Sequence, residues 1–84
     1  MRCLFALIAS VTLLGCSGQT PECATYIACQ TAIDDRLGQA LQESYGANGD
    51  CWSSTADVAK ICTETCKVGV TNLAARSPNT AACK

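Results

Sequence analysis

The apolar positions after residue 20 recur at the three- and four-residue steps of an α-helix. In the first segment they are Cys23, Tyr26, Cys29, Ile33, Leu37 and Leu41. Thr20, Pro21 and Glu22 favour a helix start, because a hydroxyl at the N-cap, a proline at the first position and an early carboxylate each suit that end. Gly46 suits the other end. The pattern therefore predicts one amphipathic helix over residues 21–45.

A second apolar stripe follows a turn segment, residues 46–50, that holds two glycines and an Asn-Gly step. Its members are Val58, Cys62, Cys66, Gly69, Val70 and Leu73. Residues 54–57 resemble a capping box, and Ser77-Pro78 stops the helix. Gly69 lies within the stripe and predicts a close approach between helices. We expect an all-α domain over residues 21–84, an antiparallel αα-hairpin with helices of about 21–45 and 54–76.

An uncharged apolar run, Cys3 to Leu14, precedes these segments. As a helix it would reach roughly 18 Å, short of a hydrocarbon core of roughly 30 Å, which favours a signal peptide over a transmembrane span. The run leads into Leu13-Leu14-Gly15-Cys16, which resembles the lipobox of bacterial lipoproteins. The resemblance implies removal of residues 1–15 and acylation of Cys16 with diacylglycerol and an N-acyl chain. The alternative is a conventional signal peptide cut nearby, after the small residues around Gly18.

The same resemblance implies a location outside the cytoplasmic membrane. Residues 16–20 would form a short tether, and the four residues after Cys16 extend at most roughly 14 Å. Ser17 follows the lipidated cysteine, at the position where an aspartate would resemble the inner-membrane retention signal. We therefore expect attachment to the outer membrane, with the domain facing the periplasm or the cell surface.

The charge of the chain limits its partners. The net charge is −1, and the loss of Arg2 with the leader would make the remainder more acidic. No basic patch lies along the sequence, which argues against nucleic acid as a partner and against electrostatic docking onto anionic lipid. Membrane attachment must then come from the acyl chains, whose buried methylenes contribute about 0.8 kcal/mol each.

Six cysteines remain once Cys3 leaves with the leader and Cys16 is acylated. They are Cys23, Cys29, Cys51, Cys62, Cys66 and Cys83. An even number in a small exported domain predicts three disulfides, for which fifteen connectivities exist. A metal site at the Cys62-x-x-x-Cys66 spacing is the weaker alternative, because the chain has no histidine and no second close pair. We expect no zinc and no other metal.

Hairpin geometry selects one pairing. In an antiparallel hairpin bent between residues 45 and 54, opposed residues have numbers that sum to about 99. Cys29 with Cys66 satisfies this within disulfide reach, whereas Cys29 with Cys62 does not. The tail after Ser77 is long enough for Cys83 to reach Cys23 at the start of the first helix. Cys51 and Cys62 then pair by elimination. The expected disulfides are Cys29–Cys66, Cys23–Cys83 and Cys51–Cys62.

The chain offers few catalytic groups. It has no histidine, no Gly-rich phosphate loop and no thiol outside the predicted disulfides. Asp34 and Asp35 are adjacent and do not share a helix face, so they are poor candidates for paired carboxylate catalysis. We expect neither enzyme activity nor a cofactor beyond the lipid.

Four residues are candidate contacts for a partner. Trp52, the single tryptophan, and Tyr45 bracket the bend. Trp52 either contacts a ligand or covers the open end of a small core, and the second interpretation is favoured. Ile61 and Val68 fall to one side of the second stripe, either as isolated surface residues or as a small patch that faces a partner.

The cysteines on both predicted helices and the bend from Tyr45-Gly46 to Gly49-Asp50-Cys51-Trp52 resemble the small cysteine-rich helical lipoproteins of Gram-negative bacteria. That resemblance implies a fold and a location and no activity. The first hypothesis is a structural or protein-interaction lipoprotein with an envelope protein as partner. The second is a binder or inhibitor that presents the Trp52 bend to a ligand or target enzyme.

Overall fold

A computed structural model describes residues 18–84, which contain three α-helices, two short 3₁₀ turns and no strand. The elements are α2 (Pro21–Ile33), α3 (Asp35–Tyr45), η1 (Asp50–Trp52), α4 (Ala56–Arg76) and η2 (Ala81–Cys83). The expected all-α class is confirmed within this range. The expected single helix over residues 21–45 is wrong, because α2 and α3 are separate helices.

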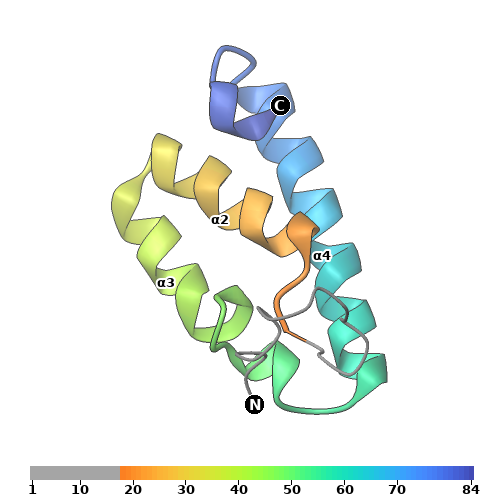
Figure 1. The fold of residues 1–84 in the computed structure, drawn as a ribbon. Helices are drawn as coiled ribbons and strands as arrows, with labels where there is room; N and C mark the ends of the chain where they lie inside the picture. The colour runs from red at the N-terminus through yellow and green to blue at the C-terminus, as the bar shows by residue number, and fades with distance from the viewer. Residues whose placement is uncertain (1–17) are drawn as a thin grey trace, which may run out of the picture.

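The chain runs up, down and up again. In Figure 1, α2 and α4 both rise toward the end that holds η2, and α3 descends beside α2. α2 therefore lies between the other two helices, with η1 against α3 and α4 and η2 against α2. The antiparallel relation expected for a two-helix hairpin is wrong for α2 and α4, because α3 returns the chain and α4 then runs in the same direction as α2.

Asp34 separates α2 from α3. Its backbone is extended, with φ −151° and ψ 106°, and its own N–H donates to the Gln30 carbonyl at the end of α2. Its carboxylate accepts from the backbone N–H groups of Arg36 at 3.0 Å and Leu37 at 3.4 Å. Aspartate is among the best N-caps, so it starts a new helix where the apolar pattern predicts continuation.

This break changes which side chains are buried. Ile33 is 39% exposed and Leu37 is 52% exposed, although both belong to the predicted core stripe. Gly38 is buried instead, and an added Cβ there would lie 2.7 Å from the Cα of Thr31. The missing side chain lets the backbones of α2 and α3 approach closely at the corner between the helices.

The other helices begin and end close to the positions that the sequence predicts. Thr20 is the N-cap residue of α2, but its hydroxyl makes no capping bond. α4 begins after Thr55, whose hydroxyl accepts from the N–H of Val58 at 3.2 Å, one residue later than the predicted capping box would place it. Gly46 is the C-cap of α3, and α4 ends at Arg76, as predicted.

Three disulfides hold the helices, and two of the expected pairs are wrong. The structure joins Cys51 to Cys62, the expected pair, but it joins Cys23 to Cys66 and Cys29 to Cys83 in place of Cys23–Cys83 and Cys29–Cys66. The reason is the direction of the helices. Contacts between α2 and α4 join residues whose numbers differ by 43: Thr20 with Thr63, Cys23 with Cys66 and Tyr26 with Gly69.

The parallel register also explains the remaining pair. The residue that follows Cys29 by the same interval is Asn72, which is no cysteine. Cys29 therefore pairs with the tail, where Ser77-Pro78 ends α4 and η2 folds back onto α2. Gly69 fulfils its predicted role in the same interface, because an added Cβ would lie 2.7 Å from Cζ of the Tyr26 ring.

Candidate functional site

Trp52 is a core residue of the bend. Its side chain is 8% exposed and belongs to one buried cluster with Cys23, Cys51 and Cys66. The indole N–H donates to the Gly46 carbonyl at 2.8 Å. A buried tryptophan whose single donor is satisfied has little free surface for a ligand. The structure therefore agrees with the interpretation of Trp52 as a cover over the core.

Tyr45 connects the bend to the helices. Its ring meets the Tyr26 ring edge to face, with centroids 5.7 Å apart and planes at 72°, a favourable geometry for an aromatic pair. Its carbonyl accepts from the Trp52 indole at 3.4 Å and from Gln19 Nε2 at 2.9 Å. Tyr45 is half-buried, so it serves mainly as a junction between α3, the bend and the start of the described chain.

The segment before α2 is fixed to the domain, which the sequence interpretation missed. Residues 18–20 are half-buried. Gln19 is bonded to Tyr45 as above, and the Thr20 hydroxyl lies 3.0 Å from the Thr63 hydroxyl on α4. Two residues of the predicted tether therefore belong to the folded domain.

The other two candidate contacts are exposed. Ile61 is 65% exposed and Val68 is 58% exposed, the two highest values among the exposed large apolar residues of the described chain. Their spacing of seven residues places them on one face of α4, away from the stripe that contains Cys62 and Cys66. Isolated exposed apolar residues are common, so this pair is a candidate contact surface of modest size.

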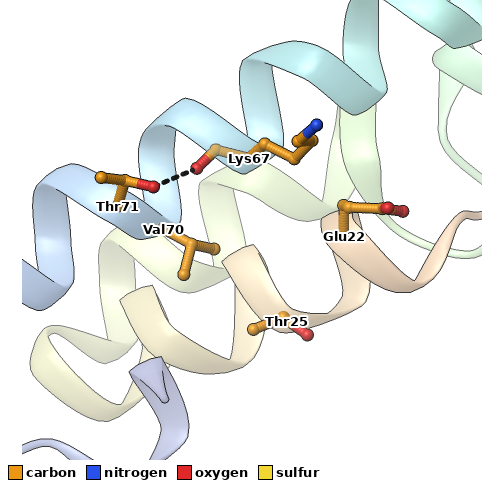
Figure 2. A pocket seen from close by; sticks show the side chains of 5 residues that line it. All are labelled: Glu22, Thr25, Lys67, Val70 and Thr71. Carbon is orange, nitrogen blue, oxygen red and sulfur yellow. Dashed lines mark hydrogen bonds between the residues drawn. The ribbon is translucent and has the colours of Figure 1, made fainter.

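A shallow groove of about 250 Å³ lies between α2 and α4. Figure 2 shows its lining side chains, Glu22 and Thr25 from α2 and Lys67, Val70 and Thr71 from α4. The Lys67 ammonium lies 3.6 Å from Glu64, and the Thr71 hydroxyl donates to the Lys67 carbonyl at 3.0 Å. The groove thus holds one carboxylate, one already paired cation and hydroxyls that are free or bonded locally. It contains no nucleophile beside a base.

The chemical inventory of residues 18–84 is small. Every cysteine in this range is in a disulfide, and no group of three or more acidic, histidine or cysteine side chains gathers there as a metal site would require. No helix in the described range has the length and apolar character that a membrane crossing needs. The signal peptide over residues 1–15 and the acylated Cys16 lie outside the described residues.

No protein-family model matches the chain, and neither the curated proteins nor the solved structures include a match.

Proposed function

We propose that the protein is a small lipoprotein of the cell envelope, anchored by diacylglycerol and an N-acyl chain on Cys16 and acting as a structural or protein-interaction module. The observation that carries the proposal is the complete pairing of the six cysteines of residues 18–84. Such pairing is typical of exported domains, where the compartment is oxidising. The lipobox-like Leu13-Leu14-Gly15-Cys16 stands directly before that domain.

The surface of the domain supports an interaction role over an enzymatic one. The groove has no nucleophile beside a base. Trp52 is buried, so a role as a ligand-presenting bend would require the core to open. Ile61 and Val68 remain as exposed apolar side chains on the outer face of α4. They are the residues through which we propose that an envelope protein contacts the domain. The outer membrane is the proposed location, because Ser17 follows Cys16.

Mass spectrometry of the membrane-extracted protein tests the anchor. We expect an N-terminal Cys16 with diacylglycerol and a third acyl chain. Cys16→Ala should move the protein out of the lipid-anchored fraction. Cys3→Ala is the matched control, because Cys3 lies in the proposed leader and its loss should leave acylation unchanged. A mature N-terminus at any other residue would overturn the lipoprotein proposal.

Cross-linking in intact envelopes tests the interaction role. A pull-down of the wild-type protein should recover a defined envelope protein. Recovery should fall for the double variant Ile61→Ser/Val68→Ser, whose side chains are already exposed and whose stability should change little. Thr65→Ser on the same helix is the control. Equal recovery from both variants would exclude this face, and recovery of a soluble exogenous protein would favour the binder hypothesis.

A further inference from the structure

The start of the described chain is attached to one end of the molecule. Gln19 Nε2 donates to the Tyr45 carbonyl at 2.9 Å, and Thr20 meets Thr63 through their hydroxyls at 3.0 Å. In Figure 1 the orange start of the chain lies toward the end of the molecule that holds the last turn of α3, η1 and the first turns of α4. We call this the bend end and define it by residues 44–57.

The distance from this attachment to the proposed lipid is short. Two residues, Ser17 and Gly18, lie between Cys16 and Gln19. The three Cα-to-Cα steps from Cys16 to Gln19 span at most about 11 Å when fully extended. The Cys16 backbone therefore lies within that distance of the Gln19 backbone, whatever path the chain takes. The acyl chains on Cys16 would therefore enter the bilayer close to the Tyr45 carbonyl, because the chain between Cys16 and Gln19 is too short to reach farther.

The exposed surface of the bend end is polar and small. Its exposed residues are Ala47, Asn48, Asp50, Ser53, Ser54, Thr55, Ala56 and Asp57. Amide and hydroxyl groups can exchange hydrogen bonds with phosphate, ester and amine groups of lipid heads. No lysine or arginine occurs in residues 44–57, and Asp50 and Asp57 are acidic, so the surface fits a zwitterionic headgroup layer better than an anionic one.

We infer that the lipidated protein stands on its bend end, with residues 44–57 against the headgroup layer of a zwitterionic bilayer. This inference rests on the proposed acylation of Cys16. The corner between α2 and α3, which carries the exposed Ile33 and Leu37, and the η2 end then point away from the membrane (Figure 1). The covalent path fixes this orientation, and no attraction by basic residues is involved.

Trp52 provides an intrinsic probe of the orientation. It is the single tryptophan, it lies at the bend end, and its indole bonds to Gly46. The acylated wild-type protein is reconstituted into phosphatidylcholine vesicles in which some lipids carry a nitroxide on the headgroup. We expect strong quenching of Trp52 fluorescence. The Trp52→Phe/Leu37→Trp variant moves the probe to the opposite corner and should show little quenching.

A longer tether is the second comparison, and it leaves the folded domain unchanged. A Gly/Ser insert of about 20 residues between Ser17 and Gly18 has a typical end-to-end distance of roughly 25 Å. The insert should remove most of the Trp52 quenching. If the Trp52→Phe background fails to fold, this insert alone still tests the inference, because it keeps Trp52 in place.

Each result has a definite meaning. Quenching of Trp52 that falls on insertion supports the orientation. If mass spectrometry shows acylated Cys16 and the protein floats with the vesicles, but the insert leaves Trp52 quenching unchanged or Leu37→Trp is quenched as strongly, the orientation is wrong and the lipoprotein proposal stands. If Cys16 carries no lipid, the lipoprotein proposal fails and the orientation falls with it.

Discussion

The α2–α4 pair and helix α3 are held in the domain by different means. Cys23–Cys66 joins α2 directly to α4, and both cysteines are fully buried. α3 contains no cysteine. It is held by the close approach at Gly38, the Tyr26–Tyr45 pair and the hydrogen bonds to the Tyr45 and Gly46 carbonyls.

The difference indicates which part of the domain can open alone. A disulfide removes conformations from the unfolded chain, so α2 and α4 remain together even when their packing loosens. α3 is held only by noncovalent packing and hydrogen bonds. Because these contacts need close packing, the loss of one weakens the others. We therefore expect α3 to have the lower local stability, with faster amide exchange than the centre of α4.

Loss of the Cys23–Cys66 link between α2 and α4 should cost more than loss of the disulfide at the bend. Cys23→Ala/Cys66→Ala should lower the free energy of unfolding by about 4 kcal/mol, from the length of the loop that the bond closes. The Cys51–Cys62 disulfide closes a much shorter loop than Cys23–Cys66 does. Cys51→Ala/Cys62→Ala should therefore lower the free energy of unfolding by only about 3 kcal/mol. Urea denaturation of both variants measures the two losses in the free energy of unfolding. A greater cost for the Cys51–Cys62 pair would contradict the ranking.

Gly38→Ala should weaken the packing of α3 against α2. The new methyl group meets the backbone of Thr31, which cannot rotate away, so the two helices must separate. Overpacking of this kind costs about 1–3 kcal/mol. The helix preference of alanine over glycine offsets about 1 kcal/mol, so we expect a net loss of about 2 kcal/mol. Hydrogen exchange should accelerate in α3 while the middle of α4 stays protected. Gln39→Ala, at an exposed neighbouring position, is the control. Uniform acceleration across all helices would show that α3 does not open separately.

Asp34→Ala should weaken the start of α3. The substitution removes the acceptor for the N–H groups of Arg36 and Leu37, and the loss of an N-cap costs about 1 kcal/mol. Asp34→Asn keeps an acceptor oxygen and should behave like the wild type. Thermal unfolding followed by circular dichroism distinguishes the two. Equal destabilisation by both variants would argue for a role of the charge instead of the cap.

Gly69→Ala should have the smallest effect, although it is the same change as at Gly38. Here the added methyl group meets the ring of Tyr26, a side chain that can move, and alanine also favours the helix by about 1 kcal/mol over glycine. We expect a net loss below about 1 kcal/mol. The near-ultraviolet dichroism of the tyrosines should change, because the Tyr26–Tyr45 pair must shift. A loss as large as at Gly38 would show that the Tyr26 ring is as rigid as backbone.

The sequence by itself determined the features that depend on neighbouring residues. The all-α class, the end of α3 at Gly46, the end of α4 at Arg76 and the close approach at Gly69 follow from periodicity and helix-end chemistry. The Cys51–Cys62 pair was expected by elimination alone, after two pairs that the structure shows to be wrong, so local sequence patterns did not determine it. The break at Asp34 could also have been predicted, because aspartate is a strong N-cap residue and here it interrupts an apolar stripe.

Only the tertiary structure decided the direction of α2 relative to α4. Helical periodicity shows which face of a helix is apolar, but it contains no information on which way a neighbouring helix runs. One break at Asp34 adds a third helix, and a third helix turns an antiparallel pair into a parallel one. Cys23 consequently pairs with Cys66, and Cys29 pairs with Cys83. Pairing between distant cysteines depends on the path of every element between them.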